Sequence, residues 1–320
     1  MPSPRSSEGT TLSVPHPLRR GLLLILAAAI AWGTGGAIAA VLFRTGGLGP
    51  IAVSFWRQAI ATATVATTTP RRPQRRRARA IATGVCLATS QAAYFGAVRE
   101  CGLAVSTLLV LGGAALASTV GGRVLLGERL GRRTVGALLT ALVGLALLLG
   151  APVKPASGAG YALAALSALT YSAVTLLGRS AFGGGVSVTT FASGALCLLP
   201  FALASGGIRP STRHLASTVV LLVVLGVVLT ALAYRWYFTG LTTVPAATAS
   251  VVTLVEPLTA AMIATGLLGE AMTPTEIIGT AVLLTAVAVL STDRGPGKDR
   301  AESGHHLPSA SHPQDRQDGV

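Results

Sequence analysis

A single carboxylate inside a long apolar run constrains this chain more than any other feature. The run extends from Thr243 to Glu270, is long enough to cross a membrane, and carries Glu256 followed at once by Pro257. A carboxylate at mid-depth in hydrocarbon is costly, so such a residue normally faces a protein interior or a water-filled cavity. The proline lacks a backbone N–H and kinks a helix, which frees carbonyls to line a cavity. The run therefore predicts a broken membrane helix with an ionisable group beside the break.

An earlier segment of the chain repeats this run. Moving back by 142 residues places Glu270 on Glu128 and Ala246 on Ala104, so the segment 103–128 is a second copy. Glu128 and Glu270 each follow a glycine just past a helix, where a capping or interfacial role is expected. Their recurrence indicates a duplicated chain and not a catalytic pair.

The composition places the chain in the membrane. Apolar residues make up 51% of the 320 residues and charged residues only 11%, against about 25% charged in globular domains. The mean hydropathy is +0.65. The net charge of +14 resides in short connections and tails, without interleaved aromatic residues, so no nucleic-acid partner is expected.

Motifs for catalysis and for metal or cofactor binding are missing from the sequence. The cysteines Cys86, Cys101 and Cys197 are scattered, which favours buried thiols over a disulfide framework. The five histidines lie outside the apolar runs, so no metal site is expected, and none of them lies in a span to activate Ser193. There is no GxxxxGK[ST] phosphate-binding motif and no HExxH. The sequence therefore predicts no enzyme, no metal, no cofactor and no ATP drive.

Ten apolar runs of about 20 residues, the length of a membrane span, follow one another along the chain. They lie at 21–43, 49–69, 80–98, 103–126, 131–150, 158–178, 186–205, 215–238, 243–267 and 273–291. The runs predict an all-α membrane protein of ten transmembrane helices, with a first five-helix repeat at 21–150 and a second at 158–291. Five is an odd number, so the two repeats must be inverted relative to each other, as in many secondary transporters. Residues 1–20 and 292–320 are polar and aperiodic, which predicts disordered tails.

Basic residues in the connections predict the orientation. With a cytoplasmic N-terminus, the inside segments carry fifteen Arg and Lys residues and the outside loops carry five. Cytoplasmic loops carry the excess of Lys and Arg. The chain is therefore predicted to be a multi-pass protein of the cell membrane, with both termini and the loops at 70–79 and 127–133 in the cytoplasm.

Short motifs, in order along the helices, carry a family resemblance over residues 18–291. They are Ala31-Trp32-Gly33, Phe55-Trp56-Arg57, the segments 93–97 and 126–130, Trp236-Tyr237-Phe238, Glu256-Pro257 and Leu268-Gly269-Glu270. With these motifs the chain resembles the EamA-type family of the drug/metabolite transporter superfamily. One departure is that Ala114 and Ala115 stand in the fourth helix where the family often has proline, which predicts a cavity less symmetric than in relatives.

The resemblance implies a secondary transporter that exports small metabolites, such as amino acids or related compounds, and is driven by an existing gradient. It also implies a central cavity lined by helices one to four and six to nine. The expected partners are a small-molecule substrate, membrane lipid and a coupling proton or other ion, and a homodimer is compatible with the sequence. The alternative is a non-transporting scaffold or sensor that kept the fold. A scaffold has no reason to retain Glu256 and Arg57 at depth.

Two charged residues lead the candidate site. Glu256 is the one acidic residue within an apolar run, and it either ties the ninth helix to a neighbour or binds a coupling proton or a cationic part of the substrate. Burial disfavours the charged form of a carboxyl group, so such a group can gain and lose a proton inside the membrane. Arg57, about 8 residues into the second helix, either pairs with a buried partner or contacts substrate. Pro257 loosens the backbone beside the carboxylate.

Aromatic and hydroxyl side chains complete the candidates. The aromatic candidates are Trp32, Tyr94, Trp236 and Tyr237. Trp32 is about 11 residues into its helix, too deep for an interfacial belt, so it is the best aromatic candidate for the cavity. The hydroxyl candidates are Ser106, Thr107, Thr248 and Ser250, in small-residue patches that let helices approach and bond across, with substrate contact as the second interpretation.

Overall fold

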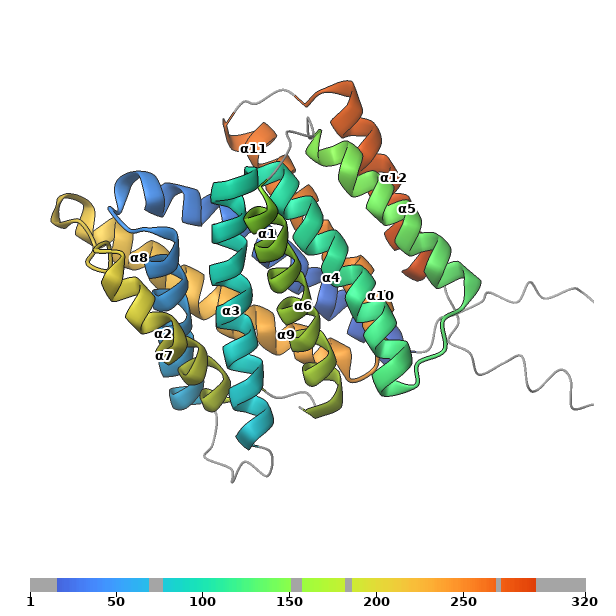
Figure 1. Cartoon of the computed structure of the whole chain (residues 1–320), viewed down its shortest axis with the longest axis horizontal. Helices are drawn as coiled ribbons and strands as arrows, with labels where there is room; N and C mark the ends of the chain where they lie inside the picture. Colours follow the sequence, from blue (N-terminus) through green and yellow to red (C-terminus); the bar gives the residue numbers. More distant parts are fainter. Residues whose placement is uncertain (1–15, 69–76, 151–156, 182–185, 269–271, 292–320) are drawn as a thin grey trace, which may run out of the picture.

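The computed structural model describes residues 16–68, 77–150, 157–181, 186–268 and 272–291. Within these ranges the regular structure is entirely helical, as the apolar runs predict (Figure 1). The helices are α1 (His16–Thr45), α2 (Pro50–Thr68), α3 (Arg77–Cys101), α4 (Leu103–Leu126), α5 (Arg132–Leu149), α6 (Gly158–Ala181), α7 (Val188–Ala204), the short η1 (Thr212–His214), α8 (Leu215–Gly226), the π-helix η2 (Val227–Leu232), α9 (Ala233–Leu241), α10 (Ala246–Thr253), α11 (Val255–Leu268) and α12 (Pro274–Ser291).

The described helices correspond to the predicted apolar runs. By length and composition, seven helical stretches of the described chain can cross a membrane, among them a joined α8–η2–α9 and a joined α10–α11. The helices α7 and α12 are apolar but shorter, whereas α2, with 19 residues, is long enough but is not among the sufficiently apolar stretches. Because α1 begins at His16, residues 16–20 are helical and do not belong to a disordered tail. Residues 1–15 and 292–320, the rest of the predicted tails, lie outside the described residues.

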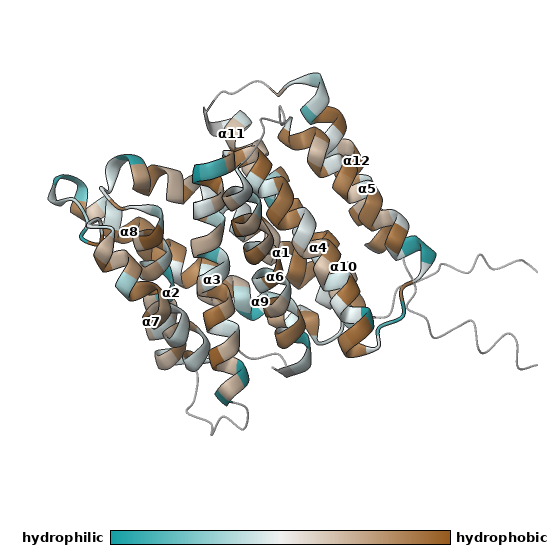
Figure 2. Cartoon of the chain, viewed as in Figure 1, coloured by the Kyte–Doolittle hydropathy of each residue, from teal (hydrophilic) through white to brown (hydrophobic). Residues whose placement is uncertain are grey.

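Large apolar side chains cover much of the outer surface. Val124 and Leu125 of α4 are 72% and 71% exposed, and Leu196 of α7 is 68% exposed. Hydrophilic residues gather at helix ends, whereas the lengths of the helices are largely hydrophobic (Figure 2). An outer surface with so many exposed apolar side chains is stable in a hydrocarbon environment, which agrees with helices embedded in a bilayer.

The two halves of the chain pack by exchanging neighbours. Helix α1 packs against α9 and α11 of the second half, and α6 packs against α3 and α4 of the first half. Between the halves, α2 also packs on α7, and α5 lies along α12 at one side of the bundle (Figure 1). Most contacts between the halves thus occur twice: a helix of the first half packs on helices of the second, and the equivalent helix of the second half packs on the equivalent helices of the first. Such reciprocity is the mark of a two-fold relation between equivalent units.

Two glycines make the contact between α5 and α12 reciprocal. A Cβ added at Gly144 would lie 2.7 Å from the Leu283 nitrogen and 2.9 Å from the Gly279 oxygen. A Cβ added at Gly279 would lie 2.8 Å from the Gly144 oxygen and would clash with the Leu148 nitrogen. Each glycine therefore faces the backbone of the other helix, and the helices touch without intervening side chains, as membrane helices often do.

Replacing Gly144 with valine is expected to destabilise the protein, because backbone atoms of α12 cannot move away as a flexible side chain can. Overpacking of this kind costs about 1–3 kcal/mol. The measurement is the thermal unfolding midpoint in detergent. The matched control is Gly136→Val in the same helix, where an added Cβ meets nothing within 4 Å. An equal midpoint for both variants would contradict the close contact of α5 and α12.

The predicted break at Glu256-Pro257 is confirmed. Helix α10 ends at Thr253, Leu254 forms a turn, and α11 begins at Val255, so Glu256 lies in the first turn of the new helix. Pro257 has no N–H to donate to the carbonyl four residues earlier, which is the physical reason that the helix is interrupted here.

The first half has no matching break. Helix α4 runs without interruption through Ala114 and Ala115, which are 3% and 1% exposed. Helix α3 is likewise continuous, whereas the π-helix η2 separates α8 from α9. The asymmetry expected from the two alanines is therefore present in the helices themselves.

Candidate functional site

Glu256 lies in electrostatic range of polar side chains from four other helices. It interacts electrostatically with Arg57 of α2, Tyr94 of α3, Tyr171 of α6 and Tyr234 of α9. These five side chains are called the central cluster below. Glu256 is partly accessible, and over the described part of the chain its carboxylate makes no hydrogen bond or ion pair with another residue. A carboxylate whose task was to tie α11 to a neighbour would be hydrogen bonded.

The π-helix η2 holds Arg57 in place. Arg57 Nε donates to Thr230 Oγ1 at 3.1 Å, and that hydroxyl donates to the Leu225 carbonyl, five residues back, at 2.7 Å. Gly226 brings the backbones of α8 and α2 together, since a Cβ there would lie 2.5 Å from Ile60 Cβ. π-Helical turns are frequent at functional sites. Here the turn presents a hydroxyl acceptor to the guanidinium, which leaves other donors of Arg57 available.

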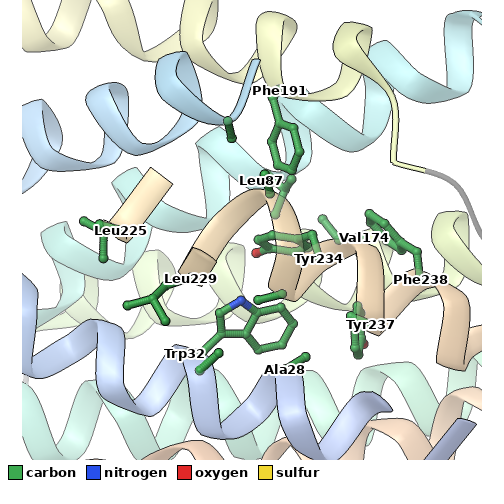
Figure 3. Close-up of a cluster of buried hydrophobic side chains, with 14 of the residues drawn as sticks. Ala28, Trp32, Leu87, Val174, Phe191, Leu225, Leu229, Tyr234, Tyr237 and Phe238 are labelled. Atoms are coloured by element: carbon green, nitrogen blue, oxygen red, sulfur yellow. The ribbon is translucent and has the colours of Figure 1, made fainter. Parts of the chain in front are cut away.

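Trp32 joins an aromatic wall beside the cluster. Its ring centroid lies 4.9 Å from that of Tyr234 and 5.1 Å from that of Tyr237 (Figure 3). The Tyr237 hydroxyl already has a hydrogen-bond partner, Thr175 Oγ1, at 2.7 Å. In contrast, the buried Trp32 Nε1 has no hydrogen-bond partner among the described residues. A buried donor without a partner is rare and costly, so it marks a place where a ligand acceptor would be favoured.

The close packing of α1 on α11 requires a glycine at position 33, directly after Trp32. A Cβ at Gly33 would lie 2.5 Å from the Glu256 carbonyl oxygen and 2.6 Å from Thr259 Cβ. The missing side chain lets α1 pack directly on the broken helix. Trp32 and Glu256 are thereby held on two helices in direct contact.

Some of the remaining candidate residues have a hydrogen-bond partner among the described residues, and others do not. The Tyr94 hydroxyl is 2.9 Å from Thr107 Oγ1, which bridges α3 and α4 as expected for a hydroxyl contact between helices. The Ser106 hydroxyl is fully buried and has no partner over the described ranges. Three further candidates lie outside the central cluster: Trp236 is partly buried against the apolar core, Thr248 is partly buried in α10, and Ser250 is buried in α10.

Two members of the cluster were missed at the level of sequence. Tyr171 lies in the middle of α6, and Tyr234 lies one turn before Tyr237. The depth argument that singled out Trp32 applies to Tyr171, which is too far from either helix end for an interfacial belt. It does not apply to Tyr234, which lies four residues before the end of the predicted run 215–238, so depth alone would have found only Tyr171.

The predicted capping role of Glu128 is confirmed. Its Oε1 and Oε2 accept hydrogen bonds from the Ala246 nitrogen at 3.1 Å and 3.0 Å, at the N-terminus of α10. Arg179, in the last turn of α6, forms an ion pair with the same carboxylate. The repeat counterpart, Glu270, lies outside the described residues.

The thiols and the ionisable groups give no sign of a metal centre. Cys86, Cys101 and Cys197 are free thiols, but each is only partly buried, whereas the sequence predicts buried thiols. Over the part of the chain that the structure describes, no group of three or more His, Cys, Asp or Glu residues lies together.

A helical bundle with an apolar exterior, and with an arginine in electrostatic range of a carboxylate that lies beside a helix break, defines a multi-pass membrane protein with an internal polar site. The family model of the EamA-like transporter family matches residues 19–150 and again residues 158–292. The chain therefore belongs to the EamA-like transporter family. The two matches also establish that its halves are copies of one unit, as the recurrence of the Gly-Glu segment predicts.

Similar proteins agree with this assignment. The uncharacterized transporter YwfM of Bacillus subtilis is 28% identical over 231 residues, covering 70% of this chain and 75% of its own. An uncharacterized transporter of Archaeoglobus fulgidus is 28% identical over 202 residues, covering 62% and 70%. A crystal structure with 22% identity has a TM-score of 0.68 and covers 84% of this chain and 96% of its own, which supports the fold alone.

Proposed function

We propose that this membrane transporter is a gradient-driven exporter of small metabolites, with Glu256 as the group that binds a coupling proton or a cationic part of the substrate. The observation that carries the proposal is a partly accessible carboxylate beside a helix break, without a hydrogen bond to another described residue and with Arg57 in electrostatic range. Ionisable groups at such depth mark ion and substrate pathways. A scaffold or sensor would have no use for this pair.

The substrate class follows from the chemistry around Glu256. A cation is offered by Arg57, an anion by Glu256, and a free donor by Trp32 Nε1. Tyr234 and Tyr237 add aromatic surface beside Trp32. A small zwitterion with an apolar part, such as an amino acid or a related metabolite, matches these groups: its carboxylate would face Arg57 and its ammonium Glu256.

Ten crossings in two inverted repeats provide the mechanism. The exchanged neighbours of the two halves and the reciprocal contact of Gly144 with Gly279 support a two-fold relation between them, and the odd number of spans in each repeat would place its axis in the membrane plane. In such transporters one repeat rocks against the other, so that a site near the midplane opens alternately to each side. The break at Leu254 and the π-helix η2 supply backbone that can change shape beside the site.

The orientation is proposed from the charges in the connections, with both termini in the cytoplasm of a cell-membrane protein. A cysteine at Gly131, before α5, is expected to react with an impermeant maleimide only in opened cells, whereas one at Gly49, before α2, reacts in intact cells. An added Cβ meets nothing within 4 Å at either glycine, so both replacements are tolerated. The measurement uses a variant in which the three native cysteines are serine. Labelling at Gly131 in intact cells would reverse the orientation.

Untargeted metabolite profiling tests the function. Cells that express the protein are expected to release one class of small metabolites faster than cells that express the Glu256→Gln variant at the same level. The variant is the better comparison because it places an equal load of protein in the membrane. Profiles that do not differ between the two would contradict export through this site.

A further inference from the structure

We propose that Glu128 and Arg179 form a latch that closes one end of the transporter, and that opening it exposes that end to the cytoplasm. The latch comprises Glu128, Arg179 and the N-terminal amide of Ala246. The inference rests on the proposed transport function for its purpose, but its geometry and its test do not require a substrate.

The latch ties the two halves together at one end. Glu128 follows α4 of the first half, whereas the groups that it binds, Arg179 and the Ala246 amide, belong to α6 and α10 of the second. Arg179 Nη1 also donates to the carbonyls of Leu241 and Val244, at 2.7 Å and 2.8 Å. One guanidinium thus joins the end of α9 and the start of α10 to the carboxylate. Charge-assisted bonds of this kind are roughly twice as strong as neutral ones.

Close packing surrounds the latch. A Cβ at Gly122 of α4 would lie 2.7 Å from Glu128 Oε2 and 3.4 Å from Ala246 Cβ. At the start of α1, a Cβ at Gly21 would lie 2.9 Å from Val244 Cγ2. Helices α1, α4, α6, α9 and α10 therefore converge at this end, and the ion pair lies where they meet.

Among the described residues, which do not include Glu270, no side chain fastens the corresponding place at the other end in the same way. Ala104, which matches Ala246 in the sequence repeat, is near the start of α4, and no side chain of the described residues hydrogen-bonds to an N-terminal amide of that helix. An added Cβ at Gly102, just before α4, would meet nothing within 4 Å. Arg44, in the last turn of α1 as Arg179 is in that of α6, is exposed. Among the described residues, the other end has one hydrogen bond between the halves, from Ser157 Oγ to Glu100 Oε2 at 2.8 Å, and no ion pair of the kind that Arg179 makes with Glu128.

The latch and the central cluster share one helix. Helix α10 extends from the capped Ala246 to Thr253, about 12 Å at 1.5 Å per residue, and the break before Glu256 follows. Because a helix of this length moves as a rod, a change at either end displaces the other. Release of the Ala246 amide would therefore shift the backbone that carries Glu256.

Hydrogen exchange of the purified full-length protein in lipid nanodiscs tests the latch. In Glu128→Gln, exchange over residues 244–249 is expected to rise by roughly tenfold, since one lost bond to a charged group is worth about that factor. A gate also requires a reciprocal change, so exchange over residues 103–107 at the start of α4 is expected to fall. The matched control is Glu276→Gln, which removes a carboxylate that caps its own helix, α12, by accepting from the Thr273 nitrogen, and is expected to change neither segment.

A second variant keeps the test decisive if Glu128→Gln does not fold. Arg179→Lys retains the charge but lacks the fork that reaches Glu128 and two carbonyls together, so it is expected to change both segments in the same directions. If hydrogen exchange rises only over residues 244–249 in either variant, Glu128 and Arg179 cap α10 and do not act as a latch. If exchange changes in neither segment, the proposal is refuted. Reciprocal changes in a protein that transports nothing would uphold the latch and refute the proposed function.

Discussion

Replacing Glu256 with glutamine is expected to reduce gradient-driven flux to the level of protein-free vesicles. Glutamine keeps the size of the side chain and its capacity to hydrogen bond, but it cannot gain or lose a proton at neutral pH and carries no charge for a cationic substrate. No other acidic residue of the described chain lies at this depth, since Glu100, Glu128 and Glu276 stand at helix ends. The measurement is uptake into reconstituted vesicles, with and without an imposed pH gradient, of the compound identified by profiling.

The control for this variant is Glu276→Gln. Glu276 belongs to a capping box at the start of α12, where its carboxylate accepts from the Thr273 nitrogen at 2.7 Å. Its replacement is expected to lower stability slightly and to leave flux near that of the parent. If Glu256→Gln folds and retains full gradient-driven flux, Glu256 is structural. If the flux of the parent does not respond to pH, the protein is a facilitator or uses another ion.

Replacing Arg57 with methionine is expected to destabilise the fold and to abolish transport, because it removes the counter-charge of Glu256 and the bond to Thr230 together. A hydrogen bond made by a charged group is worth about 1.5–3 kcal/mol. The partial exposure of both side chains brings the expected loss to the low end of this range or below it. The thermal unfolding midpoint and the flux are measured on the same preparations.

A double-mutant cycle shows whether the two charges interact. Adding Glu256→Gln to Arg57→Met is expected to recover part of the lost stability, with a coupling energy of about 0.5–3 kcal/mol. Thr230→Val is the matched control, since it removes only the hydroxyl and costs about 1 kcal/mol. Strict additivity of the Arg57 and Glu256 changes would show that each residue acts alone.

Local chemistry made much of this arrangement predictable. The break before Glu256 follows from one proline in an apolar run, and the continuity of α4 follows from Ala114 and Ala115. In both cases the deciding interaction lies within a few residues of the signal. A capping or interfacial role of Glu128 is also expected from the Gly-Glu pair just past a helix, but the sequence does not identify its partner, Ala246, which lies 118 residues away in the other half.

Contacts between distant segments were not predictable in the same way. In the π-helix η2, the Thr230 hydroxyl donates to the Leu225 carbonyl and accepts a hydrogen bond from Arg57 of another helix. The spacing of apolar residues along the sequence does not predict these two hydrogen bonds. In the sequence Arg179 is one of the basic residues beside a connection, yet in the structure it pairs with a glutamate 51 residues away. Such partners depend on how the helices pack together, and the sequence of one segment alone does not determine that packing.

The most direct measurement of the central claim is the pH inside sealed vesicles that contain the purified protein. A gradient of the identified substrate is imposed at zero initial pH difference, and internal pH is followed with a trapped dye. Proton coupling at Glu256 predicts that substrate movement through the parent shifts internal pH, while Glu256→Gln vesicles behave as protein-free ones. Substrate that moves through the parent without any change in internal pH would contradict Glu256 as the coupling carboxylate.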